Sequence, residues 1–212
     1  MNRFLSQSDL SVLRALLAAE APLPIHGLSH AAGVSVEAAA AAIHRLAQTG
    51  CKIDRHPQHG HRLTAASIEC WSDYIEAARM RRFGRRVLVY RRTASTQDVA
   101  RHLIAGVAQP GDFDGYVIAA DHQTAGRGRL GRTWHSRTGD QLLLTAIVAD
   151  TPHPPDRLML AAAVAVSRCV ESFIGRSVEL RWPNDVYVGD GKLAGILVEA
   201  GGEPRDNWWY PR

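Results

Sequence analysis

The first 65 residues carry apolar stripes separated by polar turns, a pattern that predicts three helices and a hairpin. Leu10 and Leu13 begin a stripe at helical spacing, with Ser8 or Asp9 as its cap. Gly33 would turn the chain between the second and third helices. We predict helices at residues 8–19, 24–32 and 36–48 and strands at residues 51–55 and 61–64. This order is typical of a winged helix-turn-helix domain, which we assign to residues 1–65.

Beyond this region the pattern changes to short apolar runs that alternate with helical stripes. Residues 66–84, rich in Ala, Glu and Arg, predict a linking helix that ends near residue 80. We predict further helices at residues 95–105 and 156–173, and strands at residues 87–90, 116–121, 141–149, 178–182, 185–188 and 193–198. The last three strands should be antiparallel, and the long apolar helix should be buried. Residues 85–212 therefore predict a mixed-sheet domain, and the whole chain an α+β protein.

Composition narrows the class of protein without identifying a partner. The formal net charge of +4 permits anionic partners, and Lys52 and Lys192 are the only lysines among 25 basic residues. The longest apolar run, residues 158–166, is far shorter than the ~20 residues that cross a bilayer. No hydrophobic signal core lies near the N-terminus. We expect a cytoplasmic protein with no membrane partner.

A glycine-rich segment at residues 126–131 matches the dinucleotide-binding pattern G-x-G-x-x-G but lacks its context. Such a site needs a crossover helix of about 10–12 residues before the next strand. Only residues 132–140 intervene, and they are polar without helical periodicity. Its glycines let the backbone approach a ligand closely, and the guanidinium group of an arginine can donate two parallel hydrogen bonds to a carboxylate or phosphate. We therefore interpret the segment either as an anion-clasping flap or as an Arg-rich surface loop, with these residues: Gly126, Arg127, Gly128, Arg129, Gly131 and Arg132.

Two other segments place polar groups where they could face a ligand. The sequence Arg-Trp-Pro-Asn-Asp at residues 181–185 interrupts a strand and would direct Asn184 and Asp185 into one pocket. Lys192 lies in the turn before an apolar strand, so its ammonium group could reach a ligand while its stem stays packed. Ser95 begins a helix and offers a hydroxyl beside free backbone N–H groups.

These segments together resemble the biotin–protein ligase family, in particular its bacterial members that also repress the biotin operon. The resemblance rests on four motifs in the family's order and spacing: Ser-Thr-Gln at 95–97, Gln-Thr-Ala-Gly-Arg-Gly-Arg-Leu-Gly-Arg-Thr-Trp at 123–134, Arg-Trp-Pro-Asn-Asp at 181–185, and Lys-Leu-Ala-Gly-Ile-Leu-Val-Glu at 192–199. Lipoate ligases share the fold class but as a rule lack the Gly-Arg loop. The resemblance implies a biotin/lipoate-ligase-like catalytic domain.

The resemblance also implies a two-step reaction that consumes ATP. The biotin carboxylate attacks the α-phosphate of ATP to give biotinyl-5′-AMP and pyrophosphate. A lysine of the biotin carboxyl carrier domain of a carboxylase, such as acetyl-CoA carboxylase, then takes the biotinyl group. Mg²⁺ accompanies the nucleotide. Partners implied in addition are operator DNA and, when the adenylate is bound, a second copy of the chain.

By the same resemblance each motif residue receives a role. Lys192 and Arg127 would be catalytic, and Asp185 would hold Mg²⁺ through ATP. Residues expected to contact biotin are Ser95, Thr96, Gln97, Gln123, Gly126, Arg127, Gly128, Arg129, Lys192 and Gly195. Residues expected to contact ATP or the adenylate are Arg127, Arg129, Arg132, Trp134, Asn184 and Asp185. Trp134 would pack against adenine, and Gly195 would leave room along the ligand.

The chain also departs from the family at both ends. The family continues past the last strand into a Gly-x-Gly-x-Asn strand and a small β-barrel, whereas residues 200–212 show no strand periodicity, which predicts a truncated catalytic domain. The predicted reading helix at 36–48 is rich in alanine, so few side chains reach DNA. The candidates are His44, Arg45, Arg55 and Arg62. Two alternatives to the biotin ligase function remain. One is a biotin-sensing regulator with impaired ligase activity, and the other is a lipoate–protein ligase.

Overall fold

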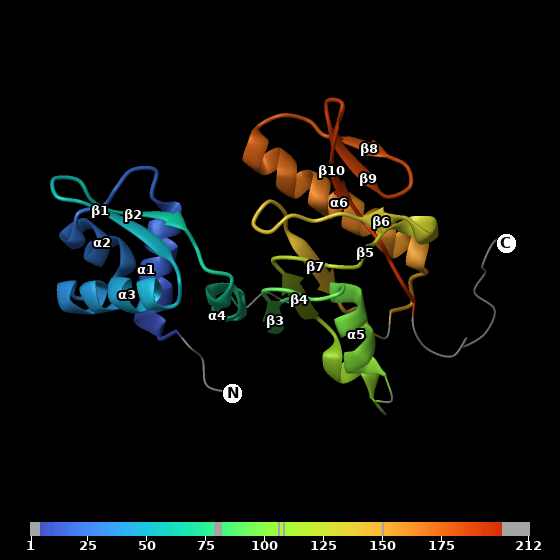
Figure 1. Ribbon diagram of the computed structural model, residues 1–212, viewed down its shortest axis with the longest axis horizontal. Helices are drawn as coiled ribbons and strands as arrows, with labels where there is room; N and C mark the ends of the chain where they lie inside the picture. The colour runs from blue at the N-terminus through green and yellow to red at the C-terminus, as the bar shows by residue number, and fades with distance from the viewer. Residues whose placement is uncertain (1–4, 79–81, 106, 108, 150, 201–212) are drawn as a thin grey trace.

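The computed structural model describes residues 5–78, 82–105, 107, 109–149 and 151–200, and it divides into two regions joined by a short helix (Figure 1). The first region holds α1 (Gln7–Ala18), α2 (Ile25–Ala32), α3 (Val36–Gln48) and the antiparallel hairpin of β1 (Lys52–His56) and β2 (Gly60–Ala65). All five predicted elements are therefore present, each within a few residues of its expected bounds.

The three helices form where their caps and apolar stripes specify them. The cap of α1 is Ser6 rather than Ser8 or Asp9, because Ser6 and Asp9 bond each other's backbone N–H in a capping box. Gly33 ends α2 in the left-handed conformation with φ of 65°, as its position predicts. The apolar faces of all three helices meet in one core, which α1 dominates through residues that include Leu10, Leu13 and Leu16.

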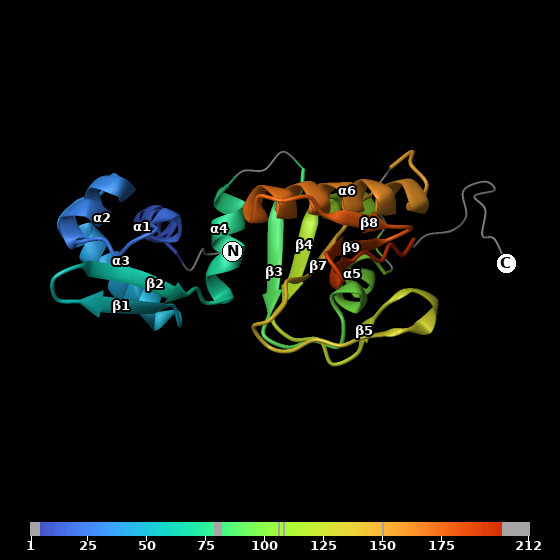
Figure 2. The same ribbon diagram turned by 90° about the horizontal axis from the view of Figure 1, so that it is seen from above.

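The linking helix α4 (Glu69–Ala77) contacts both regions (Figure 2). It is shorter than predicted, because residues 66–68 connect β2 to the helix without helical structure; residues 79–81 lie outside the described residues. Cys70 packs into the helical core, and the carboxylate of Asp73 accepts a hydrogen bond from the Leu5 backbone at 2.7 Å. At its other end, Glu76 accepts a hydrogen bond at 2.8 Å from the backbone of Val87 in the next strand.

The second region contains two small three-stranded sheets. In the first, β3 (Arg86–Tyr90) runs parallel to β4 (Tyr116–Ala120), which pairs antiparallel with β7 (Leu143–Ala146). In the second, β8 (Glu179–Arg181), β9 (Asp185–Val188) and β10 (Gly191–Gly195) form an antiparallel meander, as predicted. The short hairpin of β5 (Gly126–Arg127) and β6 (Thr133–Trp134) lies in the predicted flap.

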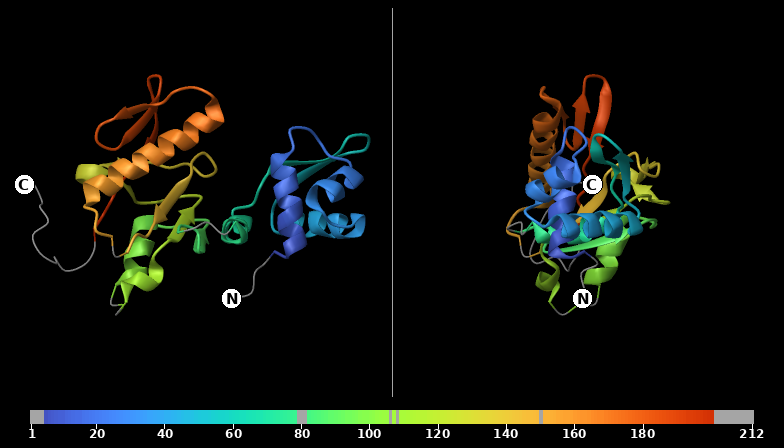
Figure 3. Two further views of the ribbon diagram at one scale, coloured as in Figure 1. Left: turned by 180° about the vertical axis from the view of Figure 1, so that it is seen from behind. Right: turned by 90° about the vertical axis from the view of Figure 1, so that its left-hand side faces the viewer.

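Two further helices flank the sheets. The helix α5 (Thr96–Ile104) follows β3, and α6 (Pro155–Ile174) runs along β8 and β9 (Figure 3). The prediction that α6 is buried was wrong, because only Met159, Ala163 and Ser167 are buried on it. Phe173 is 84% exposed and Leu160 is 41% exposed. Its apolar sequence covers little of either sheet, since the contacts lie along one narrow stripe.

No helix among the described residues is long and apolar enough to cross a membrane. The segment 201–212, for which we predicted no strand, lies outside the described residues.

Candidate functional site

A chain of three polar side chains lies at the start of α5. Thr145 of β7 donates a hydrogen bond to the hydroxyl of Thr96 at 2.8 Å, and that hydroxyl donates to Oε1 of Gln123 at 2.9 Å. The Thr96 backbone N–H also donates to this oxygen, at 2.7 Å. Ser95 caps the helix by accepting from the Gln97 backbone, and both Ser95 and Thr96 are buried. Of the predicted biotin-contacting residues at the start of α5, Thr96 therefore meets Gln123 directly.

The backbone of Gln123 is held in place by the side chain of Ser136. Its N–H donates to the hydroxyl of Ser136 at 3.0 Å, and that hydroxyl donates back to the Gln123 carbonyl at 3.0 Å. Gly126 lies so close that an added Cβ would sit 2.6 Å from the Trp134 carbonyl and 3.0 Å from Nε2 of Gln123. Only glycine fits this position without displacing the backbone.

The segment that follows is an ordered hairpin rather than an open loop. Its strands β5 and β6 pair in antiparallel fashion, and the short helical turn Arg129–Gly131 joins them. The backbone N–H of Gly128 donates to the carbonyl of Arg132 at 2.7 Å, which closes the turn. We refer to residues 126–134 as the flap. Hairpin pairing fixes which of its side chains face the rest of the site.

Arg127 of the flap contacts two carboxylates. Its Nη1 lies 2.9 Å from both oxygens of Asp98 on α5, and its Nε lies 3.6 Å from Glu199. The hydrogen bond and charge of Arg127 hold the pKa of Asp98 below its usual range, and the hydrogen bond and charge of Asp98 raise the pKa of Arg127. Nε and Nη2 of Arg127 are buried without a hydrogen-bond partner among the described residues.

A second cluster lies in the β8–β10 sheet. The ammonium group of Lys192 is 2.7 Å from Oδ2 of Asp185, while Oδ1 of Asp185 is buried without a hydrogen-bond partner among the described residues. The two residues belong to neighbouring strands, β10 and β9, so the sheet itself sets this contact. In such a pair the ammonium group can bind an anion, and the second carboxylate oxygen can bind a cation.

Two carboxamides fix the chain just after β10. Nε2 of Gln97 donates to the Leu197 carbonyl at 3.0 Å. Nδ2 of Asn184 donates to the Ile196 carbonyl at 3.0 Å, and the Ile196 N–H donates to the Asn184 carbonyl at 2.9 Å. The segment therefore bridges the start of α5 and the β8–β10 sheet.

The flap connects the two clusters. Nη1 of Arg129 donates to Oδ1 of Asn184 at 3.5 Å. The Lys192 ammonium lies 5.5 Å from the centre of the Trp134 ring, within the range of a cation–π contact. A Cβ on Gly195 would lie 3.1 Å from this ring and 3.3 Å from Cε of Lys192, so glycine lets the three groups approach. Residues from all four motifs thus lie in one continuous region.

Not every predicted site residue joins it. The Arg132 side chain is exposed, and only its backbone takes part in the flap. The four candidates for DNA contact lie in the first region, where Arg55 and Arg62 are exposed on the hairpin and His44 is exposed on α3. Arg45 instead bonds the buried carboxylate of Asp9 through Nε at 2.9 Å and Nη2 at 2.7 Å, so its guanidinium supports the core.

Sequence reasoning missed five residues that organise the site. They are Asp98, Ser136, Gln141, Thr145 and Glu199. Thr145 gave a usable signal, because it is a polar residue at an inward position of an apolar strand. Asp98 stands in the first turn of a helix, where an acidic residue is ordinarily explained by the helix dipole alone. Its partner is distant in sequence, so the contact could not be foreseen.

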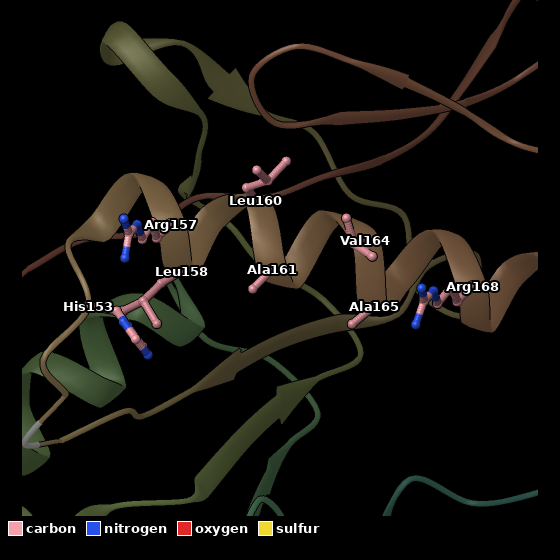
Figure 4. Close-up of a pocket in the computed structure, with 8 residues that line it drawn as sticks. All are labelled: His153, Arg157, Leu158, Leu160, Ala161, Val164, Ala165 and Arg168. Atoms are coloured by element: carbon pink, nitrogen blue, oxygen red, sulfur yellow. The ribbon is translucent and has the colours of Figure 1, made fainter.

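A separate hollow of about 810 Å³ lies along α6 and contains none of the predicted site residues (Figure 4). Its lining is mostly aliphatic, with His153, Arg157 and Arg168 as the charged or polar groups. Leu160 and Val164 face it from a single helix. Among the residues that the structure describes, its lining offers no carboxylate, carboxamide or hydroxyl, so we place the candidate site at the flap.

Comparison with known proteins identifies the family of the chain. The model of the biotin/lipoate A/B protein ligase family matches residues 89–204, which is more than half of the chain. The chain belongs to this family. The match includes both polar clusters and the flap, and it leaves out the helical region before residue 89.

Individual relatives carry more specific names than the family does. The chain is 31% identical over 174 residues to the bifunctional ligase/repressor BirA of Bacillus subtilis, covering 81% of this chain and 53% of that protein. It is 42% identical over 112 residues to the biotin–[acetyl-CoA-carboxylase] ligase of Mycobacterium tuberculosis, covering 50% of this chain and 42% of that one. The chain thus spans about half the length of the curated relatives it matches.

Among solved structures, the biotin protein ligase from Aquifex aeolicus in complex with biotin and ATP is 31% identical. It aligns with 54% of this chain and 46% of its own, with a TM-score of 0.45.

Proposed function

We propose that the chain catalyses ATP-dependent activation of biotin to biotinyl-5′-AMP and its transfer to a lysine of a biotin carboxyl carrier domain. The observation that carries this proposal is that one flap contacts two clusters of polar residues, one neutral and one charged. Neutral hydrogen-bonding groups gather around Gln123, and charged groups gather around Lys192. Biotin has the matching division, because its ureido ring is neutral and its carboxylate is charged.

The neutral cluster supports binding of the ureido ring. Ser95, Thr96 and Gln123 offer hydroxyl and carboxamide groups that are already oriented by hydrogen bonds. Such preorganisation lowers the entropy lost when a polar ligand binds. Backbone atoms at Gly126 and Gly128 would approach the ligand closely, and Gln97 would fix the neighbouring segment.

The charged cluster supports the first chemical step. A carboxylate oxygen of biotin attacks the α-phosphorus of ATP, and the bond from that phosphorus to pyrophosphate breaks. Lys192 would neutralise the two anions as they meet, and Arg127 and Arg129 would hold the phosphate when the flap covers it. Trp134 would pack against adenine, Gly195 would leave room beside it, and Arg132 would meet the outer phosphates.

A magnesium ion fits this cluster through one carboxylate. Oδ1 of Asp185 is buried and has no hydrogen-bond partner among the described residues. Mg²⁺ commonly takes one or two protein carboxylates and completes its shell with phosphate oxygens and water. Asp185 and Asn184 would therefore hold the metal and the nucleotide, and Mg²⁺ would add positive charge at the phosphates.

The second step needs access from outside. The amine of a carrier lysine attacks the carbonyl carbon of the adenylate, the bond to AMP breaks, and the amine releases a proton. The flap lies at the surface, with Leu130 89% exposed, so a carrier domain could approach there. We also propose that the chain forms a dimer with a second copy of itself when the adenylate is bound.

Incubation with ATP, Mg²⁺ and radiolabelled biotin tests the proposal. We expect biotinyl-AMP by thin-layer chromatography and label on an added carrier domain. Lipoate in place of biotin is the matched competitor, and we expect no lipoyl transfer. Lipoyl transfer alone would replace biotin by lipoate in the assignment, whereas adenylate without transfer would favour a biotin-sensing regulator.

We further propose that residues 1–65 form a winged helix-turn-helix domain that binds DNA, that residues 66–84 link it, and that residues 85–212 form the catalytic domain. Support comes from the three helices and hairpin in their observed order and from the ligase/repressor relative matched over 81% of the chain. His44, Arg55 and Arg62 are among the exposed side chains available for phosphate contact. A mobility-shift assay with the DNA upstream of biotin genes tests this part.

A further inference from the structure

Four charged side chains from three separate segments meet beside the flap. Asp98 and Arg101 lie on α5, Arg127 lies on β5, and Glu199 follows β10. Arg101 binds both oxygens of Glu199 through Nη2, at 2.9 and 3.1 Å, and its Nη1 lies 3.7 Å from Asp98. Two carboxylates and two guanidinium groups cancel in charge, so the group of four is neutral. We call it the latch.

Within the latch, Arg127 is the only member that belongs to the flap. Its Nη1 is shared by both oxygens of Asp98, and its Nε faces Glu199 at 3.6 Å. Its Nη2 is buried and has no hydrogen-bond partner among the described residues. A buried guanidinium nitrogen without a partner is costly, so its position calls for an anion or an acceptor.

We infer that Asp98 is a positioning residue for the flap, which holds Arg127 so that Nη2 remains available to an anionic ligand. Asp98 is not among the residues expected to contact biotin or ATP, and it acts on the ligand only through Arg127. It sits in the first turn of α5, two residues after Thr96, so the helix that presents the neutral cluster also anchors the flap. Glu199 supports the same guanidinium from the other side while Arg101 holds Glu199. The role of Arg127 at the ligand rests on the proposed function, whereas the anchoring of the flap by Asp98 does not.

This arrangement has a consequence that can be measured without any ligand. The flap contains three arginines, so trypsin can cut it after Arg129 and Arg132 whenever it opens. Cleavage of a briefly opened segment follows the population of the open form. A flap fastened by Asp98 should therefore resist trypsin more than one that has lost this contact.

The first experiment compares Asp98→Asn with the parent chain under native conditions, with cleavage sites assigned by mass spectrometry. Asparagine keeps the size but loses the charge, and we expect cleavage after Arg129 to speed up about tenfold, as for loss of one charge-assisted hydrogen bond. Asp98→Glu should stay close to the parent. Glu179→Gln is the matched control, because it removes an exposed carboxylate that bonds Arg181 outside the flap.

Cleavage after Arg168 in α6 serves as an internal reference for global opening. Faster cleavage in the flap alone supports the inference. Equal acceleration at both places would assign Asp98 a general stabilising role and overturn it, as would flap cleavage within about twofold of the parent.

The second experiment measures dissociation of added biotinyl-AMP. We expect Asp98→Asn and Arg127→Gln each to speed dissociation, and the double variant to be no faster than Arg127→Gln, because Asp98 acts through Arg127. Additive effects would contradict that route. If the chain forms no adenylate and binds none, the proposed function fails while the trypsin result still decides whether Asp98 anchors the flap.

Discussion

Residues 5–70 bury twelve of the 21 apolar side chains that are largely removed from solvent, whereas the longer stretch from residue 82 to residue 200 buries nine. The large apolar side chains left exposed are distributed in the opposite way, since ten of the eleven in the described parts of the chain follow residue 80. The first region is therefore held together by one apolar core. The second is held largely by strand pairing, hydrogen bonds and ion pairs around the candidate site. Substitutions should accordingly affect stability in the first region and ligand chemistry in the second.

The largest effect should come from the core of the first region. Leu13 is completely buried on α1, so Leu13→Ala should lower the free energy of unfolding of this region by about 2–5 kcal/mol. Leu160→Ala on the exposed face of α6 is the matched variant and should cost less than about 1 kcal/mol. Urea denaturation, with hydrogen exchange of α1 to assign the transition, measures both. Equal losses would erase the contrast between the regions.

Next in size is the loss of the ammonium group at the charged cluster. Lys192→Ala should slow adenylate formation by about 10²–10³-fold, the usual result of removing one preorganised electrostatic group. The fold should remain, because the Lys192 side chain is partly exposed and what it would lose is the ion pair with Asp185 and the contact with Trp134. Lys52→Ala, at the only other lysine, is the control and should leave the rate unchanged. A rate for Lys192→Ala near that of the parent would remove Lys192 from the chemistry.

A smaller effect concerns the pH dependence of the first region. Burial raises the pKa of Asp9, but hydrogen bonds from Arg45 and Ser6 outweigh it, so the folded-state pKa lies below the ordinary value. The stabilisation is then complete above about pH 4 and is lost as the pH falls through the folded-state pKa. Asp9→Asn should cost about 1–3 kcal/mol at pH 7 and should flatten the acid side of the stability profile. An unchanged profile would show that the ion pair contributes nothing.

The smallest effect is expected in DNA binding. With Arg45 engaged by Asp9, we expect only about 2–4 phosphate contacts, which gives a log–log salt slope of about −2 to −4. Arg62→Ala should reduce this slope by about one, whereas Arg45→Ala should lower stability instead. Fluorescence anisotropy over a range of salt concentrations measures the slope. A steep slope with a tight, sequence-selective footprint would show that the first region is a stronger DNA-binding domain than its surface suggests.

Local signals made much of the fold predictable. Gly33 and the helix 36–48 behave as their caps and spacing indicate, and the last three strands pair as their tight turns require. The burial of α6 could not be predicted, because periodicity identifies an apolar helix but not what packs against it. Likewise the four motifs identified the family, and they contain most of the residues that the structure brings together at the candidate site. The partners of Arg127 and Arg45 are more than 25 residues away along the chain, and only the folded chain shows that both side chains pair with carboxylates.

The hydroxyl chain from Thr145 to Gln123 has one more consequence, which concerns the orientation of an amide. Because Oε1 of Gln123 accepts two hydrogen bonds from Thr96, the amide cannot rotate to present its oxygen without losing both. The NH₂ end therefore faces Gly126, where an added Cβ would lie 3.0 Å from Nε2. For biotin to bind here as proposed, it would have to offer this NH₂ group a lone pair, such as the carbonyl oxygen of its cyclic urea, whereas a group that offers only N–H would find no acceptor at this end of the amide. The hydroxyl of Thr96, which Thr145 supports, would thus set the polarity of the ligand group that Gln123 can bind.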